Sequence, residues 1–134
     1  MCIRDRHPAD AEKAIEIGLD GLGVTNHDAR QFNGAPASIE VLPLIVDVVQ
    51  NRVPIIFDSG IDSGLNAMRA LYLGADFVLA GRAFISAVAA IGEYGGDHAF
   101  HILTDDLINN MTQLGVSTIE ELRKADVFTN SAEM

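Results

Sequence analysis

Apolar positions along the chain follow two patterns, one typical of buried strands and one typical of helices. Short apolar runs rich in branched side chains suit the strands of a sheet covered on both faces, and they span residues 20–25, 53–57 and 77–80. Apolar positions three and four residues apart predict helices, at residues 8–17, 38–50, 65–73, 83–91 and 98–114. This alternation predicts an α/β fold in which parallel strands are joined by right-handed crossovers.

Local signals support the ends of several helices. Pro8 is tolerated in the first turn of a helix, and Gly18 is placed to end it. Gly115 ends the long helix near the end of the chain, and Ser117 with Thr118 offers an N-cap for one more short helix.

Length and charge narrow the classes of protein. A chain of 134 residues has the size of one domain. No apolar run approaches the roughly 20 residues that cross a bilayer, and no signal peptide is evident. We therefore expect a cytoplasmic protein without an integral membrane segment. The net charge of -10 argues against nucleic acid as a partner.

Polar and glycine-rich segments follow each of the three predicted strands, at the end where parallel α/β folds bind ligands. After the first strand, His27 and Arg30 lie three residues apart and can face one small ligand. After the second, Gly60 and Gly64 let backbone N–H groups approach an anion. The third is followed by Gly81 and Arg82, and a guanidinium binds phosphate well. The three segments together favour an anion-binding site.

Each of these residues, taken alone, also has an ordinary structural explanation. A single loop histidine such as His27 is more often solvated than catalytic, and Arg30 alone suits a surface ion pair. Asp58 could cap the turn that follows its strand, and Thr25 has high strand propensity and needs no ligand to explain it. His98 and His101 lie one helical turn apart without a third ligand nearby, so no metal site is predicted.

The first polar segment carries a recognisable motif. Asn-His-Asp-Ala-Arg-Gln at residues 26–31, followed by Gly-Ala-Pro-Ala-Ser at 34–38, resembles the active-site signature of the FMN-dependent 2-hydroxy-acid dehydrogenases and oxidases. Asp-Ser-Gly-Ile at 58–61 and Gly-Arg at 81–82 fall where that family binds the flavin phosphate and ribityl chain. The resemblance runs from about residue 7 to residue 126. Within the family, the sequence is most similar to those of bacterial L-lactate dehydrogenases.

The resemblance implies a fold, a cofactor and a reaction. The fold is the C-terminal part of a (β/α)8 TIM barrel, with about three parallel strands and their helices. The implied cofactor is FMN, and the implied reaction is the oxidation of a small L-2-hydroxy acid to the 2-oxo acid. L-lactate is the first candidate substrate. His27 would be the catalytic base, and Arg30 would hold the substrate carboxylate. The full-length protein would be a homo-oligomer.

The same resemblance implies which residues bind the flavin. Thr25 would hydrogen-bond the ring system. The ribityl chain and the phosphate would be bound by Asp58, Ser59, Gly60, Ile61, Asp62, Gly81 and Arg82.

The chain departs from the family pattern in three places. Asp28-Ala29 stands where the family usually has Gly-Gly, which puts a carboxylate beside the proposed base. Asp62 stands where an arginine is usual, so a phosphate partner is replaced by a like charge. Residues 1–6 hold neither the family's flavin-contacting lysine nor strand character, and the substrate-binding tyrosine, second arginine and histidine-orienting aspartate of the family have no counterpart.

We therefore expect three segments: a non-native or disordered start at residues 1–6, the barrel part at 7–126 and a tail at 127–134. Two alternatives stay open. The chain could be an inactive half-barrel or assembly module that binds little flavin alone. It could also belong to another FMN barrel, such as a type 2 isopentenyl-diphosphate isomerase, which gives no role to His27 and Arg30 together. Peripheral attachment to the inner membrane and the electron acceptor are also open.

Overall fold

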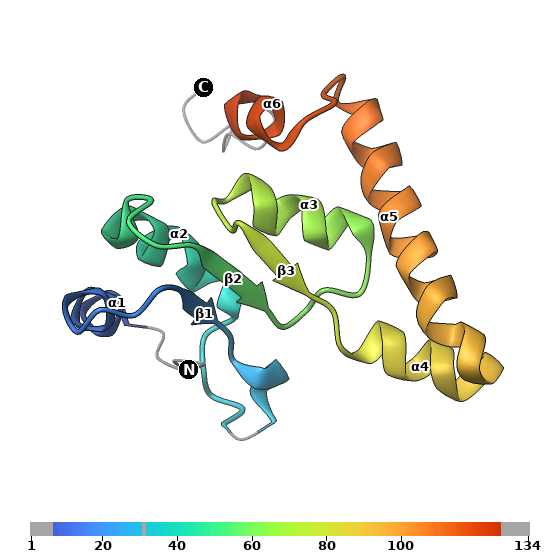
Figure 1. The fold of residues 1–134 in the computed structure, drawn as a ribbon, viewed down its shortest axis with the longest axis horizontal. Helices are drawn as coiled ribbons and strands as arrows, with labels where there is room; N and C mark the ends of the chain where they lie inside the picture. Colours follow the sequence, from blue (N-terminus) through green and yellow to red (C-terminus); the bar gives the residue numbers. More distant parts are fainter. Residues whose placement is uncertain (1–6, 31, 127–134) are drawn as a thin grey trace.

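The protein contains one parallel three-stranded sheet in the order of the chain (Figure 1). The computed structural model describes residues 7–30 and 32–126, so the expected start and tail segments lie outside the described residues. The strands are β1 (Leu22–Val24), β2 (Ile55–Asp58) and β3 (Phe77–Leu79). Gly23 pairs with Ile56, which pairs in turn with Phe77. The α/β alternation expected from the sequence is confirmed.

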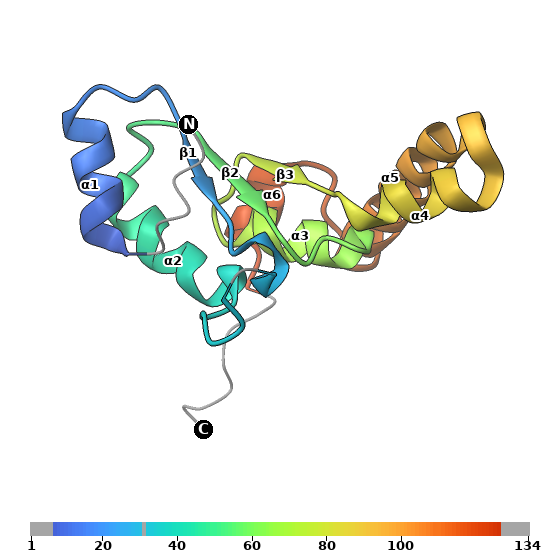
Figure 2. The same ribbon diagram turned by 90° about the horizontal axis from the view of Figure 1, so that it is seen from below.

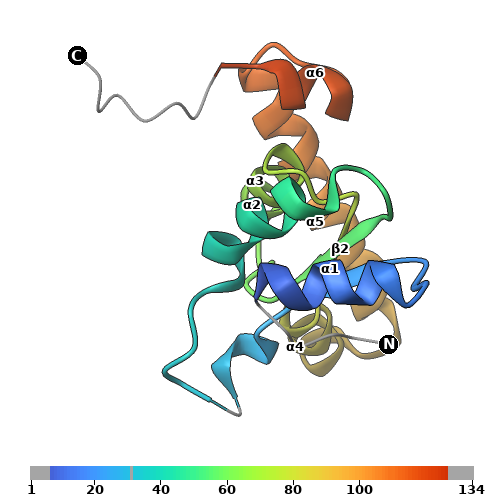
Figure 3. The same cartoon turned by 90° about the vertical axis from the view of Figure 1, so that its left-hand side faces the viewer.

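Helices connect the strands and extend beyond them. They are α1 (Pro8–Glu16), α2 (Ser38–Val49), α3 (Gly64–Tyr72), α4 (Arg82–Ile91), α5 (Gly95–Gln113) and α6 (Ile119–Lys124), with short 3-10 turns η1 (His27–Ala29) and η2 (Gly92–Tyr94). Helices α2 and α3 lie on the same side of the sheet (Figure 2), and α1 lies alongside α2 (Figure 3). Helices α4 and α5 form a hairpin that projects from the end of β3 (Figure 1).

The core lies between the sheet and the helices on this one side. Val24 and Phe57 are neighbours on adjacent strands, and both are almost fully buried. They pack with Leu42 and Ile45 from α2 in the main apolar cluster. A second cluster joins α3, α5 and α6 around Met68, Met111 and Leu122. Apolar residues recurring at helical spacing therefore mark the core side of α2 correctly.

The other face of the sheet is uncovered within the described residues, which corrects the prediction of strands covered on both faces. Phe77 and Leu79 point to this face and are 62% and 52% exposed. Because successive strand residues point to opposite sides, Val78 between them packs on the core instead. In a (β/α)8 barrel the corresponding face points to the barrel interior, where branched and bulky side chains are expected.

Two carboxylates near the end of the described chain have structural roles. Glu121 accepts hydrogen bonds from the backbone N–H groups of Ser117 and Thr118 and completes a capping box at the start of α6. The bond from Ser117 lowers the pKa of Glu121 below its usual range. Asp106 on α5 accepts a hydrogen bond of 3.2 Å from the backbone N–H of Leu65 at the start of α3. The Glu121 bonds fix the start of α6, and the Asp106 bond ties α5 to the start of α3.

Gly64 also has a structural role, which corrects the expectation that it opens backbone N–H groups to an anion. It is buried at the contact between α3 and α5. A methyl group at this position would lie 2.1 Å from the backbone nitrogen of Leu107, closer than any real contact. The absence of a side chain therefore lets the two helices approach each other.

We predict that Gly64→Ala destabilises the protein by about 1–3 kcal/mol, the usual cost of overpacking, because the backbone of α5 cannot move aside locally. Gly96→Ala is the matched control, since Gly96 lies in the first turn of α5 with open space around it. Alanine there should raise stability by up to about 1 kcal/mol through helix propensity. Urea unfolding of both variants measures the two effects, and equal stabilities would contradict the packing role.

Candidate functional site

The polar strand ends meet around one cavity of ≈ 270 Å³. The parallel strands bring their carboxyl ends to the same edge of the sheet, so the three loops that follow lie side by side. All candidate residues from the sequence except Thr25 and Gly64 line this cavity, namely His27, Arg30, Asp58, Ser59, Gly60, Ile61, Asp62, Gly81 and Arg82. Asp28, Leu79 and Ile85 complete the lining.

Thr25 lies beneath the loops and is only 7% exposed. Its hydroxyl donates a hydrogen bond of 2.6 Å to Asp58 Oδ2. Thr25 Oγ1 also accepts the backbone N–H of His27 at 3.0 Å and lies 3.0 Å from Ser59 Oγ. Because a hydroxyl has one proton, already given to Asp58, Ser59 donates to Thr25 in this arrangement. Thr25 thus uses its donor and both acceptor positions within the protein.

The loop after β1 adopts an unusual backbone conformation. His27, Asp28 and Ala29 have φ angles of 52°, 53° and 59°, in the left-handed region. This region costs L residues roughly 1–2 kcal/mol each, and only aspartate and asparagine reduce the cost by local hydrogen bonding. The backbone N–H of Asp28 donates to Ser59 Oγ at 3.3 Å. The second loop therefore supports the conformation of the first.

The two residues proposed to handle the substrate have exposed side chains. His27 and Arg30 both face the cavity, and no described residue forms a hydrogen bond or ion pair with either side chain. The arrangement leaves one imidazole and one guanidinium available to the same small ligand.

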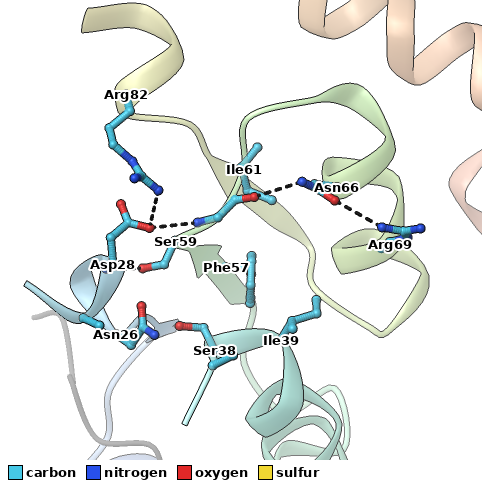
Figure 4. A pocket seen from close by; sticks show the side chains of 13 residues that line it. Asn26, Asp28, Ser38, Ile39, Phe57, Ser59, Ile61, Asn66, Arg69 and Arg82 are labelled. Atoms are coloured by element: carbon cyan, nitrogen blue, oxygen red, sulfur yellow. Dashed lines mark hydrogen bonds and ion pairs between the residues drawn. The ribbon is translucent and has the colours of Figure 1, made fainter. Parts of the chain in front are cut away.

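The carboxylate of Asp28 binds two of the groups expected to bind phosphate. Asp28 Oδ1 accepts the backbone N–H of Gly60 at 3.1 Å and lies 2.9 Å from Arg82 Nη2. Figure 4 shows the Asp28 side chain pointing toward Arg82 and the loop between Ser59 and Ile61. The sequence identifies Asp28 only as a departure from the family pattern, whereas the structure makes it the centre of a three-loop contact.

A second set of polar contacts holds the loop after β2. Asn66 donates to Asp62 Oδ1 at 2.6 Å and to the carbonyl oxygen of Gly60 at 3.3 Å. Arg69 in turn donates to Asn66 Oδ1 at 3.4 Å (Figure 4). Asn66 and Arg69 line a neighbouring cavity of ≈ 390 Å³ that shares Asp28, Gly60 and Arg82 with the first. Sequence reasoning missed both residues, although their place in the first two turns after a glycine-rich loop is a usable signal.

The sequence model of the FMN-dependent dehydrogenases matches residues 6–129 of the chain. The chain belongs to the FMN-dependent dehydrogenase family. It is 41% identical over 124 residues to an L-lactate oxidase of Lysinibacillus sphaericus, covering 92% of this chain and 32% of that protein. It is 39% identical over 125 residues to an L-lactate dehydrogenase of Chromohalobacter salexigens, covering 93% and 32%. The chain thus spans about a third of the length of these curated relatives.

Solved structures give the same result for the fold. A lactate oxidase of Pediococcus acidilactici superposes with a TM-score of 0.86 at 41% identity, covering 91% of this chain and 34% of that one. A mandelate oxidase solved with (S)-2-phenylpropionate gives a TM-score of 0.85 at 33% identity, covering 90% and 36%. The three strand–helix units of this chain therefore have the fold of about a third of a (β/α)8 barrel, as the sequence predicts.

The residues at this edge of the sheet fit the phosphate of FMN. Arg82 and the backbone N–H of Gly60 converge on one carboxylate oxygen, that of Asp28, so the same two donors suit a phosphate oxygen. Ser59 and Gly60 both have positive φ angles, of 89° and 78°, which turns this backbone into a concave donor surface.

Other site types find no support in the part of the chain that the structure describes. Residues 7–30 and 32–126 contain no group of three or more metal-ligating side chains. Among the same residues, no helix has the length and apolar character to cross a membrane.

We predict that Ala29→Gly raises the stability of the protein by about 0.5–1 kcal/mol, because glycine removes the cost of a left-handed backbone but adds freedom to the unfolded chain. Ala89→Gly in the exposed last turn of α4 is the control, and it should lower stability by up to about 1 kcal/mol. Urea unfolding measures both changes. A loss of stability in Ala29→Gly of the size seen in the control would show that the backbone at Ala29 is not strained.

Proposed function

We propose that the protein takes part in the FMN-dependent oxidation of a small L-2-hydroxy acid to the 2-oxo acid. The first candidate substrate is L-lactate. The observation that carries this proposal is the shared cavity. His27 and Arg30 line it together with Gly60 and Arg82, the two donors that suit a flavin phosphate. One cavity thus contains a base, a carboxylate-binding group and a phosphate-binding group.

His27 is the base in this proposal, and it takes a proton from the substrate. Histidine suits this role because it is the side chain that most often acts as a general base in enzymes. Its position in a loop fixed by the Thr25 hydroxyl keeps the backbone of the base in place relative to the sheet. FMN, when bound, would supply the acceptor for the two electrons and the second proton that leave the substrate.

Arg30 holds the substrate carboxylate. A planar guanidinium grips a carboxylate with two parallel hydrogen bonds and so fixes the direction of the neighbouring α-carbon. Three carboxylates, those of Asp28, Asp58 and Asp62, line the same cavity. An anionic substrate therefore needs a strong local cation, which Arg30 supplies.

The uncovered face of the sheet is the side on which the other strands of a complete barrel would lie. Phe77 and Leu79 are exposed on the side that corresponds to a barrel interior. The chain spans 32% of the curated relatives, so turnover is proposed for these residues within a complete barrel. The chain alone is expected to bind little FMN, and tight stoichiometric binding by the chain would prove this expectation wrong.

Two alternatives make different predictions for the same residues. An assembly module would keep its structure when His27 and Arg30 are both replaced, and it would have no use for a cavity with those two side chains. An FMN-dependent isomerase would use the phosphate donors but not the His27 and Arg30 pair. The presence of both residues in the lining of one cavity favours the hydroxy-acid reaction.

The proposal is tested in a chimera in which residues 7–126 replace the matching third of the Pediococcus acidilactici lactate oxidase, a fold match with a TM-score of 0.86. We predict that L-lactate reduces the bound flavin under anaerobic conditions. His27→Asn should slow this reduction about 100-fold or more, because a general base commonly contributes that much. Stopped-flow absorbance of the flavin measures the rate.

Arg30→Lys is the matched variant for substrate binding. It keeps the charge but loses the two-point contact, so it should raise the L-lactate concentration needed for half-maximal reduction while FMN stays bound. Reduction by L-lactate at an unchanged rate in His27→Asn would contradict the role of His27. If the chimera binds FMN but no 2-hydroxy acid bleaches the absorbance of the flavin, the proposed reaction is excluded.

A further inference from the structure

The Asp28 carboxylate occupies the place that an external anion would take. Its Oδ1 atom lies 3.1 Å from the backbone nitrogen of Gly60 and 2.9 Å from Arg82 Nη2. These two groups come from the ends of β2 and β3, and Asp28 comes from the loop after β1. Two donors from separate loops thus converge on one oxygen of a negatively charged group, which is the arrangement that binds a phosphate oxygen.

We propose that Asp28 is an internal competitor that sets the affinity of this site for phosphate. While Asp28 holds Gly60 and Arg82, both donors are engaged, and a phosphate must displace the carboxylate to bind. The proposal rests on the proposed function only in taking phosphate as the anion. The competition itself depends on three residues of this chain and on the contacts between them.

The backbone of Asp28 favours this role over a chance surface contact. Its φ and ψ angles of 53° and 34° are left-handed, and its N–H donates to Ser59 Oγ at 3.3 Å. The main chain is therefore held against the loop after β2 independently of the carboxylate. Replacing the carboxylate by a neutral group of the same shape should leave this backbone contact in place.

The strength of the competition follows from the exposure of the pair. The Arg82 side chain is 70% exposed and that of Asp28 is 30% exposed, so water screens their attraction. Exposed ion pairs of this kind change an equilibrium by about fivefold at most. The carboxylate therefore tunes phosphate affinity and does not abolish it.

The direct test uses inorganic phosphate as the probe and the amide signal of Gly60 as the readout. Phosphate is titrated into the 15N-labelled chain at constant ionic strength, and two-dimensional NMR gives the dissociation constant. Asp28→Asn should bind phosphate about fivefold more tightly than the parent chain, because a neutral amide holds Arg82 less strongly. In Asp28→Asn with Arg82→Gln this gain should disappear.

Asp62→Asn is the matched control. It removes the same charge from a residue that lines the same cavity but contacts Asn66, not Arg82 or the Gly60 N–H. Its effect on phosphate affinity should be under about twofold, as expected for a screened charge that does not touch the ligand. An equal gain in Asp62→Asn would show a net-charge effect and overturn the proposal.

Two further results would also overturn it. One is unchanged phosphate affinity in Asp28→Asn with an intact fold, judged by the remaining amide signals, which would make the carboxylate a structural tie only. The other is phosphate-induced shifts away from Gly60. Loss of lactate oxidation in the chimera would count against the proposed reaction alone, because the phosphate titration does not depend on it.

Discussion

The hydroxyl of Thr25 is the contact on which the arrangement of the site depends. It lies at the carboxyl end of β1 and bonds to Asp58 and Ser59 at the end of β2. It also accepts the backbone N–H of His27. A single buried oxygen thus connects the loop with the proposed base to the loop with the phosphate donors. Because burial makes an unsatisfied polar group costly, this geometry is strongly preferred over alternatives that leave the hydroxyl unpaired.

Parallel strand pairing determines which residues can share the cavity. It brings three loops to one edge of the sheet, although the residues they carry are far apart in the sequence. The Arg82 side chain contacts Asp28 across 54 positions. The Asp28 substitution then adds an anion at the point where the three loops meet. The same fold can therefore adjust phosphate affinity through one loop residue without a change in the sheet.

The sequence predicts the strands, the parallel order and most of the cavity lining, because these follow from apolar periodicity and from polar residues at strand ends. It does not predict the partners of those polar residues. Thr25 looks like an ordinary strand residue, and its three hydrogen bonds depend on the register between β1 and β2. Gly64 looks like an anion-binding glycine, yet its neighbour is α5, about forty positions later in the chain. Such long-range contacts leave no local pattern.

The exposure of the second sheet face is another feature that the local sequence pattern does not predict. The apolar run of β3 is typical of a strand covered on both sides, but described helices lie on only one of them. The apolar side chains of Phe77 and Leu79 on β3 would favour a second layer on this face, because contact with that layer would remove their apolar surface from water. The family match and the (β/α)8 fold of its structural relatives agree with this assignment.

The role of Thr25 is tested most directly by amide hydrogen exchange in Thr25→Val, which keeps the shape of the side chain and removes its hydroxyl. We predict faster exchange at the amides of His27 and Asp28, because both amides donate to hydroxyl oxygens of this network. The amide of Leu22, bonded to the carbonyl oxygen of Pro54 at 3.0 Å, should exchange as before and serves as the internal reference. Unchanged exchange at His27 and Asp28 would contradict the account.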